Sequence, residues 1–379
     1  MVTISLDISH VPSKKVDFLL EKVPFLSEVI TGISYDNTNK KIHVTTSLNN
    51  SDSPKVKEIY ESFEKLNKSI ENLRVIKSKV IKSNENKEEK KAVIKSDNQK
   101  KSFVNETEII LMDMLDKLFI KIAKKYGAEL REYPTILSQN NMNRNQYHIN
   151  FPQNIYGVTS VPHNLNVIQE FRQNSLTNNF SNSFNFQGEF LQPCICYHCY
   201  EENQGQLLTS NKVLTGKGKC FRNEIHWKKD QFRQNEFLMR EIVFMGNEQW
   251  VIQIRDLIME DVWKSFESIG FIGKIATATD PFFFSQDMSA KGTFQMMSNA
   301  KYELIVTTKN GKESSIASFN YCQDMLCNKY DIKDDDENSL YSGCVAFGID
   351  RWKEAFIDLY SYDTANWPEI SMDWEEILV

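Results

Sequence analysis

The sequence predicts an α+β fold in which helices flank a largely antiparallel sheet, with a small α/β module at the N-terminus. Residues 220–244 read CFRNEIHWKKDQFRQNEFLMREIVF, two strand-like ends around a polar middle, which is typical of a hairpin. Strand-like segments alternate with helical ones without the regular strand–helix–strand order of a parallel sheet. The sequence has no glycine-rich phosphate loop, which argues against a P-loop or a dinucleotide-binding domain.

Composition narrows the classes of protein further. The 379 residues suffice for one large domain and a small one, and the hydrophobic content of 41% is typical of a folded protein. A net charge of −6 gives no overall basic field for nucleic acid. No apolar stretch approaches the ~20 residues of a membrane span, and the N-terminus lacks a secretion-signal layout. Seven irregularly spaced cysteines favour a reduced compartment, so we expect a cytoplasmic protein with free or metal-bound thiols.

Residues 1–75 are predicted to form the small accessory module. Val2–Leu6 and Lys41–Thr46 alternate like strands. Ser53 and Pro54 then open an amphipathic helix, the serine as its cap and the proline in its first turn.

Residues 76–103 are rich in Lys, Glu, Ser and Asn, and we expect a charged flexible linker there. Residues 104–379 are predicted to form the main domain. It begins with a long amphipathic helix from Glu106 to Tyr126, which Gly127 ends. A strand at Ala128–Pro134 follows.

The remainder of the main domain alternates in type. Residues 139–190 are rich in Asn, Gln and Phe, and we interpret them as loops over the sheet. Trp250–Ile269 is predicted to be a helix, and Lys274–Thr279 and Lys301–Val306 to be strands. Residues 343–352 are predicted to be a strand that runs into a helix.

The hairpin at 220–244 carries the candidate chemistry. Folded as a hairpin, it brings five side chains into one patch. They are Arg222, Glu224, Arg233, Phe237 and Glu241. Planar arginine forks suit phosphate oxygens, and an aromatic face suits a purine. The alternative is an ordinary surface hairpin with ion pairs.

The order Phe-Arg-x-Glu, a loop, then Arg-x-x-x-Phe-x-x-x-Glu resembles motif 2 of the class II aminoacyl-tRNA synthetases. Gly343–Trp352 resembles their motif 3, a strand leading into a helix that carries Arg351. The helix, strand and proline between residues 106 and 134 resemble motif 1, which forms the dimer interface of these enzymes. The resemblance therefore implies a class II fold and a homodimer.

The class II layout implies that Cys196, Glu241 and Cys344, each on a central strand or its edge, face one cavity. Two thiolates and a carboxylate make a three-ligand zinc site, whose open position would take the α-amino group of an amino acid. One alternative is that these cysteines are plain buried thiols. Another is a closed four-cysteine zinc site. Its ligands would be Cys196, Cys199, Cys322 and Cys327.

A cavity zinc of this kind resembles that of the archaeal-type zinc-dependent seryl-tRNA synthetases. The sequence is more similar to their relatives, the amino acid:[carrier protein] ligases, over residues 105–360. The matching stretches are Cys196–His198, Arg240–Val243, Ser318–Tyr321, Gln323–Asp324 and Cys344–Gly348. Cys322 stands where the ligase pattern has a histidine. The first 100 residues match neither pattern and look too short for a tRNA-binding domain, so a tRNA partner is not expected.

The resemblance implies that ATP activates glycine, alanine or serine as an aminoacyl adenylate. The acyl group then passes to the phosphopantetheine thiol of a carrier protein. Arg222 would hold the α-phosphate, and Arg233 and Arg351 would hold the β- and γ-phosphates. The alternatives are tRNA aminoacylation of the seryl type, or a non-catalytic synthetase-like binding subunit.

Further roles follow from the same resemblance. Phe237 and Arg351 would sandwich the adenine, and Glu224 would accept a hydrogen bond from its amino group. Glu313 would bind the Mg²⁺ that accompanies ATP. Asn320 and Ser318 would line the amino-acid site.

Overall fold

The computed structural model describes residues 1–71, 73, 75–85 and 103–368. The chain forms two compact units. The N-terminal unit comprises residues 1–78, 225–229 and 278–298, and the large unit comprises the rest. The longer part of the predicted linker, 86–102, lies outside the described residues.

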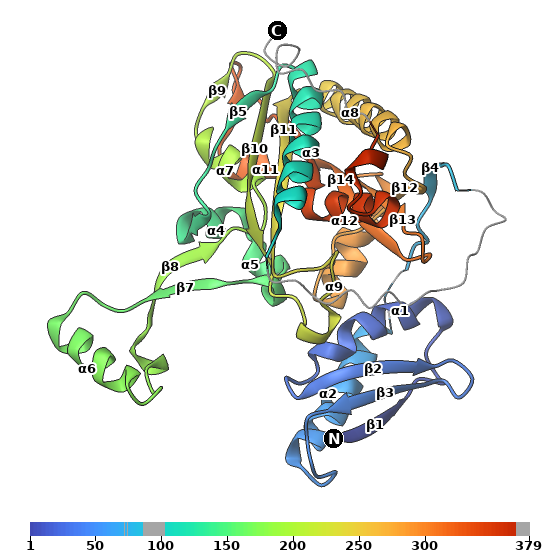
Figure 1. The fold of residues 1–379 in the computed structure, drawn as a ribbon, viewed down its shortest axis with the longest axis vertical. Coiled ribbons are helices and arrows are strands. Elements are labelled where there is room, and N and C mark those ends of the chain that lie inside the picture. The colour runs from blue at the N-terminus through green and yellow to red at the C-terminus, as the bar shows by residue number, and fades with distance from the viewer. Residues whose placement is uncertain (72, 74, 86–102, 369–379) are drawn as a thin grey trace. The chain divides into compact units, whose positions relative to one another are not determined.

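The N-terminal unit contains a three-stranded antiparallel sheet with two helices (Figure 1). Its elements are β1 (Val2–Asp7), α1 (Ser13–Lys22), β2 (Ile30–Asp36), β3 (Lys41–Thr46) and α2 (Pro54–Ile70), with the strands in the order β1-β3-β2. The Ser53 hydroxyl accepts a hydrogen bond from the Lys55 backbone N–H at 3.4 Å, as expected of a helix cap.

Two segments distant in sequence complete this unit. One is 225–229, the tip of the predicted hairpin, and the other is 278–298. The Trp227 indole donates a hydrogen bond to the Ile30 carbonyl at 3.1 Å, and its ring packs against the core of the unit. The second segment contains α9 (Ser285–Asp287), a π-helical turn (Met288–Gly292) and α10 (Thr293–Met297).

The large unit is built on an eight-stranded sheet in the order β4-β12-β13-β14-β16-β11-β10-β5. All neighbours are antiparallel except β5 and β10. The strands are β4 (Val80–Ser83), β5 (Glu129–Arg131), β10 (Lys212–Phe221), β11 (Glu236–Gly246), β12 (Gly273–Thr277), β13 (Lys301–Thr307), β14 (Glu313–Gln323) and β16 (Tyr341–Gly348). This arrangement confirms the predicted α+β fold.

Three helices cover one face of this sheet: α3 (Glu106–Lys125), α8 (Glu248–Ser268) and α12 (Ile349–Tyr360) (Figure 1). Phe119 of α3 stacks on Phe347 of β16 with ring centroids 4.1 Å apart, and Trp352 of α12 lies edge-on to Phe119. Asn105 and Glu108 close the first turn of α3 as a reciprocal capping box. The predicted helices at 106–126 and 250–269 are thus confirmed.

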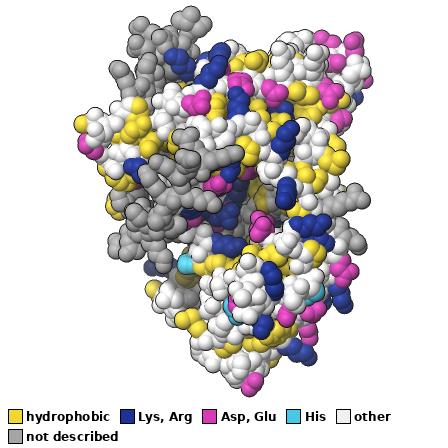
Figure 2. Space-filling model, turned by 90° about the vertical axis from the view of Figure 1, so that its right-hand side faces the viewer, with side chains coloured by type: hydrophobic (Ala, Val, Ile, Leu, Met, Phe, Trp, Pro, Cys, Tyr) yellow, Lys and Arg dark blue, Asp and Glu magenta, His cyan; other side chains and the backbone are white. Residues whose placement is uncertain are grey.

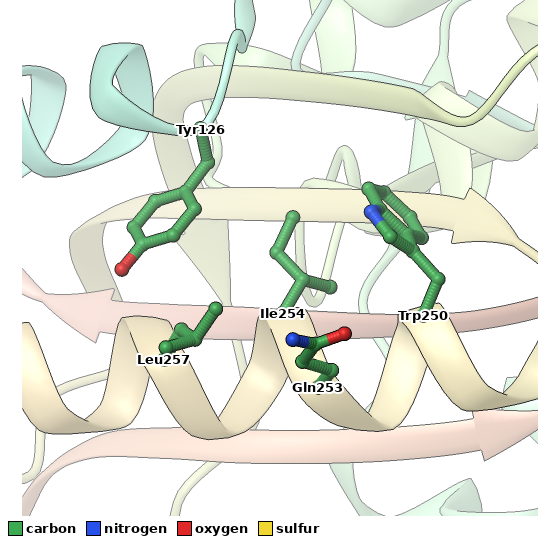
Figure 3. Close-up of a pocket in the computed structure, with 5 residues that line it drawn as sticks. All are labelled: Tyr126, Trp250, Gln253, Ile254 and Leu257. Atoms are coloured by element: carbon green, nitrogen blue, oxygen red, sulfur yellow. The ribbon is translucent and has the colours of Figure 1, made fainter.

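A pocket of about 290 Å³ lies in this helical layer, between the end of α3 and α8 (Figure 3). It is lined by Tyr126, Trp250, Gln253, Ile254 and Leu257. The lining is mostly apolar and holds no acidic or basic side chain. The chemistry predicted from the sequence lies on the other face of the sheet, as described below.

The predicted linker contains a strand of the large sheet. Within 76–103, β4 pairs with β12 and forms the sheet edge. Lys82 forms an ion pair with Glu260 at 2.5 Å, and the Asn84 side chain accepts a hydrogen bond from the Gly273 N–H. The strand was not predicted because the surrounding segment is rich in lysine and its own apolar residues, Val80 and Ile81, lie exposed at the sheet edge.

The interpretation of residues 139–190 as loops is wrong. The segment contains three α-helices and two strands, and its strand β8 is the middle strand of a β6-β8-β7 sheet, in which β6 directly precedes the segment. The elements are β6 (Ile136–Ser138), α4 (Gln139–Asn145), α5 (Tyr147–Asn150), β7 (Gly157–Ser160), α6 (Leu165–Ser175) and β8 (Asn185–Leu191). Ser138 and Asn164 cap α4 and α6, so the polar residues that suggested loops act as helix caps.

The remaining elements are short. They are α7 (Cys196–Glu202), β9 (Leu207–Leu208), α11 (Met325–Lys329) and β15 (Lys333–Asp334). Among the described residues, no helix has the length and apolar character needed to cross a bilayer.

A buried ion pair fastens α3 to β11. Arg240 donates to both carboxylate oxygens of Asp116, at 2.5 and 3.0 Å, and Lys217 approaches the same carboxylate at 2.9 Å. Arg240 and Asp116 are only 4% and 5% exposed, so water cannot solvate either charge when its partner is removed.

We predict that Asp116→Ala lowers the free energy of unfolding by about 3–5 kcal/mol, because it strands the Arg240 charge in the interior. Chemical denaturation of the variant measures this loss. Lys125→Ala is the control, since Lys125 is exposed where it pairs with Asp261 and should change stability by less than ~1 kcal/mol. Equal effects of the two substitutions on the free energy of unfolding would contradict the conclusion that the buried Asp116–Arg240 pair stabilises the fold.

Candidate active site

The predicted hairpin is confirmed by the pairing of β10 with β11, in which Cys220 lies opposite Phe237. Beyond the strand, the chain is held around Asn235. The Arg222 N–H donates to the Asn235 carbonyl at 2.8 Å, and the Glu224 N–H donates to its side-chain oxygen at 3.2 Å. The turn therefore has a fixed shape at the point where it presents its arginine and glutamate.

Two arginines project from this turn. The Arg222 guanidinium lies over the Phe237 ring, 5.2 Å from its centroid, and donates to the Pro193 carbonyl at 3.2 and 3.3 Å. Arg233 is half-exposed, and its Nε lies 3.7 Å from the Glu224 carboxylate. The structure therefore brings together four of the five predicted hairpin residues through direct contacts.

Arg351 comes from the first turn of α12. It donates to the Ser315 carbonyl at 2.8 Å. Its side chain lies along Gly348, where an added Cβ would be 3.3 Å from the Arg351 Cδ. Gly348 pairs with Met239, two residues from Phe237 on β11, so Arg351 lies just beyond the strand that neighbours the strand of Phe237.

The three arginines act on one another electrostatically. Burial, followed by the positive charges of Arg222 and Arg233, lowers the Arg351 pKa to about 10, whereas Glu303 and Glu224 oppose the shift. Burial has the largest effect, and the repulsion by two like charges adds to it. A bound polyanion would relieve this repulsion, which is the electrostatic property expected of a polyphosphate site.

The sequence analysis missed Glu303. It lies on β13 opposite Ser318, and its carboxylate is 3.3 Å from the Lys301 ammonium. The buried neighbours Tyr302 and Leu304 face the helices, so strand alternation alone could have placed Glu303 on the opposite face.

Glu313, the predicted magnesium ligand, begins β14 and lies opposite Thr307. Its carboxylate contacts the Lys274 ammonium at 2.6 Å. No contact joins it to the three arginines in the described residues, and its magnesium role stays a prediction.

The Glu241 carboxylate accepts two backbone hydrogen bonds at the start of α7. One oxygen accepts the Ile195 N–H at 3.0 Å, and the other accepts the Cys196 N–H at 3.1 Å. The Cys344 thiol is a hydrogen-bond partner of the Cys196 side chain. The structure thus places Cys344 and Glu241 beside Cys196, but among the described residues the predicted trio does not form a group whose ligand atoms all lie within 4.8 Å of one another. Cys196 begins a helix and does not lie on a strand.

A further thiol belongs to this cluster. The Cys194 and Cys196 sulfurs are 3.4 Å apart, and the ligand atoms of Cys194, Cys196 and Glu241 all lie within 4.8 Å of one another. The sequence analysis did not select Cys194, since a C-x-C spacing has no clear ligand signature. We call Cys194, Cys196, Glu241 and Cys344 the cysteine–glutamate cluster.

The cluster is electrostatically suited to a cation. Burial, followed by the nearby Cys344, raises the Glu241 pKa to about 8. Hydrogen bonds from Cys194 and Cys344, together with burial, raise the pKa of the Cys196 thiol. A divalent ion reverses such shifts, because its charge favours thiolate and carboxylate. Sulfur and carboxylate donors fit a zinc ion.

The alternative four-cysteine site is not formed by the described residues. Cys199 hydrogen-bonds with Tyr133, and Cys327 with Ser342. These two thiols share one core cluster but have different hydrogen-bond partners.

The predicted substrate residues lie beside the cluster. The Asn320 amide donates to the Ser318 hydroxyl at 3.1 Å and to the Cys344 sulfur at 3.4 Å. Asn320 and Cys344 are also paired across β14 and β16. Their role toward an amino acid stays a prediction.

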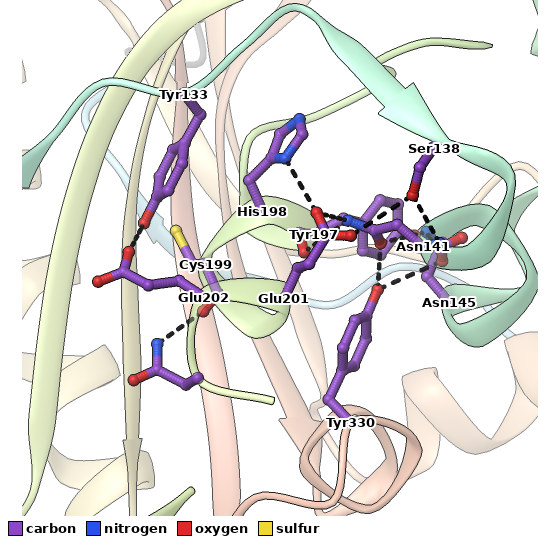
Figure 4. A network of polar contacts seen from close by, with 11 residues as sticks. Tyr133, Ser138, Asn141, Asn145, Tyr197, His198, Cys199, Glu201, Glu202 and Tyr330 are labelled. Atoms are coloured by element: carbon purple, nitrogen blue, oxygen red, sulfur yellow. Dashed lines mark hydrogen bonds and ion pairs between the residues drawn. The ribbon is translucent and has the colours of Figure 1, made fainter. Parts of the chain in front are cut away.

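A polar network fixes α7 behind the cluster (Figure 4). The Tyr133 hydroxyl donates to Glu202 at 2.5 Å, and the Asn141 amide donates to Glu201 at 2.7 Å. The Tyr330 hydroxyl donates to the Asn141 side chain at 2.5 Å. Three separate segments thus hold the helix that begins at the metal-ligand candidate.

The comparison with known structures decides the fold. The Methanopyrus kandleri seryl-tRNA synthetase, solved in complex with A. aeolicus tRNASec, matches with a TM-score of 0.67 and 16% identity. The match covers 97% of this chain and 76% of that one. The fold is that of the class II synthetases. The Pyrococcus horikoshii seryl-tRNA synthetase, solved in complex with ATP, also matches, with a TM-score of 0.52. This match covers 68% of the present chain and 53% of the P. horikoshii protein.

The class II synthetase-like chain also has curated relatives in sequence. It is 26% identical over 254 residues to the amino acid–[acyl-carrier-protein] ligase 1 of Bradyrhizobium diazoefficiens. The match covers 65% of this chain and 76% of that protein. It is 25% identical over 190 residues to the type-2 serine–tRNA ligase of Methanococcus maripaludis, 48% of this chain and 37% of that protein. No protein-family model matches the sequence. The resemblance to both groups is therefore confirmed.

We predict that Cys196→Ser and Cys344→Ser each lose bound zinc while the protein stays folded, because an open site contributes less to folding than a closed structural site. Elemental analysis and circular dichroism of the purified variants check this. Cys327→Ser, a buried thiol outside the cluster, is the control and should retain the metal. Unfolding of both cluster variants, but not of the control, would mean that the metal is structural.

Proposed function

We propose that this protein uses ATP to activate a small amino acid as an aminoacyl adenylate and transfers it to the phosphopantetheine thiol of a carrier protein. The observation that carries the proposal is the convergence of Arg222, Arg233 and Arg351 beside the cysteine–glutamate cluster. This pairs a polyphosphate site with a site for an amine. The cytoplasm is the expected compartment, and a homodimer the expected assembly.

Arg222 is the residue best suited to the α-phosphate. Its Nε and Nη2 donate to the Pro193 carbonyl, which orients the guanidinium and leaves further N–H groups for a phosphate oxygen. Arg222 also covers one face of the Phe237 ring, so an adenine would stack on the opposite face. Arg233 and Arg351 would then hold the β- and γ-phosphates.

Glu224 is proposed to accept a hydrogen bond from the adenine amino group. Arg233 approaches only one oxygen of the Glu224 carboxylate, so the other oxygen can accept this bond. Glu313 is proposed to bind the magnesium that accompanies ATP. Since Lys274 neutralises Glu313 in this structure, magnesium binding there requires Lys274 to move.

The amino-acid site would adjoin the cluster. Cys196, Glu241 and Cys344 would hold a zinc ion, which when bound supplies a Lewis-acidic position for the substrate α-amino group. Asn320 and Ser318 would contact the same substrate. Glycine, alanine and serine are the proposed substrates.

The chemistry needs no nucleophilic side chain. The substrate carboxylate attacks the α-phosphorus, an oxygen–phosphorus bond forms, and pyrophosphate leaves. Arg222 stabilises the charge that develops on the phosphorus oxygens, and the other two arginines hold the leaving group. The carrier thiol then attacks the activated carbonyl carbon, and AMP leaves. Positioning and electrostatics account for both steps.

The carrier-protein reading is supported by the extent of the sequence matches. The two B. diazoefficiens ligases match over 76% and 78% of their lengths, against 32% to 53% for six type-2 serine–tRNA ligases. The net charge of −6 also gives no general attraction to tRNA. Acidic and basic side chains are interspersed on the face seen in Figure 2.

A second candidate is aminoacylation of tRNA with serine. The structural match to the M. kandleri seryl-tRNA synthetase covers 97% of this chain and hence most of the N-terminal unit, a likeness of fold that the sequence patterns did not reveal.

We predict that Arg222→Ala lowers the rate of amino-acid-dependent ATP–pyrophosphate exchange by about 10²–10³-fold, the effect of losing one transition-state donor. The assay, run with each of the twenty amino acids, also identifies the substrate. Arg172→Ala, an exposed arginine on α6, is the control and should leave the rate unchanged. An unaffected rate in the Arg222 variant would remove its assigned role, and no exchange with any amino acid in the wild type would favour a non-catalytic binding subunit.

We predict that the purified protein loads a phosphopantetheine-bearing carrier protein and not tRNA. Radiolabelled amino acid should become bound to the carrier through a thioester that hydroxylamine cleaves. The same carrier without its phosphopantetheine is the matched control and should stay unlabelled. Charging of tRNA with serine, without loading of the carrier, would reverse the choice between the two candidates.

A further inference from the structure

Cys194 stands out because its thiol belongs to the cysteine–glutamate cluster but has no place in the three-ligand site described above. Its sulfur is 3.4 Å from that of Cys196. Among the described residues, the ligand atoms of Cys194, Cys196 and Glu241 form a potential metal-binding group, all within 4.8 Å of one another.

The position of Cys194 is imposed by the backbone on both sides. On one side, the Pro193 carbonyl accepts the two hydrogen bonds from Arg222. On the other, the N–H groups of Ile195 and Cys196 both point to Glu241. The residues on either side of Cys194 are thus tied to two charged side chains, so the closeness of the two sulfurs does not depend on a loose loop.

Packing beneath this segment reinforces the placement. Ile195 is fully buried, and a Cβ added to Gly216 or Gly218 of β10 would lie 3.1 or 3.0 Å from its side chain. The Gly-x-Gly pattern of β10 therefore lets the segment lie close against the strand. Cys194 itself is half-buried, whereas Cys196 and Cys344 are buried, so it is the most exposed thiol of the cluster.

We propose that Cys194 is a fourth protein ligand, which closes the metal centre when no amino acid is bound and gives up its position to the substrate α-amino group. The inference rests on the proposed function for the identity of that substrate. Zinc favours four ligands, and Cys194 supplies the fourth from within the chain.

The charges explain why this ligand would be the one to leave. Three thiolates and a carboxylate together carry four negative charges around one divalent ion, and replacing a thiolate by a neutral amine lowers their mutual repulsion. The exchange is balanced in protons, since the substrate ammonium loses one on becoming a ligand and the released Cys194 thiolate gains one. Cys196 and Cys344 are more deeply buried, which makes their release less favourable.

The number of sulfur ligands is measurable with cobalt(II) in place of zinc, because the near-ultraviolet sulfur-to-cobalt absorbance increases with each thiolate bound. We predict that the full-length wild type absorbs about 1.5-fold more strongly per bound cobalt than Cys194→Ala, as three thiolates compare with two. Cys327→Ala is the matched control and should equal the wild type.

Addition of glycine, alanine or serine provides the second readout. The wild-type absorbance should fall to the level of Cys194→Ala with at least one of these amino acids, while the absorbance of the variant itself should not fall. This titration of the wild type alone still tests the proposal if the variant does not fold.

The outcomes separate this inference from the proposed function. Equal absorbance of wild type and Cys194→Ala overturns the inference and leaves the three-ligand site intact. A wild-type absorbance that no amino acid changes overturns the displacement, while ATP–pyrophosphate exchange reports independently on the proposed function. Failure of the reduced wild type to bind cobalt removes the metal centre and the inference with it.

Discussion

The Glu241 carboxylate is the group on which the rest of the site depends. It is 2% exposed and lies in the middle of the sheet, with Gly216 and Ala346 on the neighbouring strands. Both of its oxygens accept backbone N–H groups, which draws the start of α7 onto the sheet. A carboxylate buried beside thiols is costly unless a cation accompanies it, as its raised pKa reflects. The fold therefore favours an ion at this position.

The same segment joins the two halves of the site. Ile195 and Cys196 bind Glu241, and Pro193 binds Arg222. The backbone of residues 193–196 thus fixes the distance between Arg222, which suits the α-phosphate, and the cysteine–glutamate cluster, which suits an amine. In an adenylation reaction these two substrates must meet, and such fixed positioning contributes directly to the rate.

Because side chains alternate along a strand, the structural ion pair and the candidate site lie on opposite faces of the sheet. On β11, Arg240 points toward the helices and pairs with Asp116, whereas the next residue, Glu241, points to the opposite face and meets the cysteines. One strand thereby anchors the motif 1 helix and presents a metal-ligand candidate. A shift of one residue in its register would exchange the two sides and destroy both.

Much of this could be predicted from the sequence. The hairpin follows from its alternation, and the pattern of Arg222, Arg233 and Arg351 was sufficient to indicate the class II layout. The edge strand β4 was missed because its two apolar residues, Val80 and Ile81, stand in a segment rich in lysine and remain exposed at the sheet edge. Cys194 was missed because only its tertiary surroundings identify it.

Glu303 and the fold of residues 139–190 were missed for related reasons. Glu303 appears in sequence as one polar position of a strand, and its closeness to Arg351 depends on the order of β13, β14 and β16. In 139–190 the helices are short and their caps are made by Ser and Asn, residue types that also favour loops. Local composition cannot separate these two uses.

The central claim is that the cysteine–glutamate cluster holds a zinc ion beside the arginines. Anomalous diffraction at the zinc edge, from crystals of the purified full-length protein, tests it most directly. The account predicts one peak about 2.3 Å from the sulfurs of Cys196 and Cys344, within bonding distance of Glu241. A cluster without a peak in zinc-containing crystals, or a peak centred on Cys199 and Cys327, would contradict it.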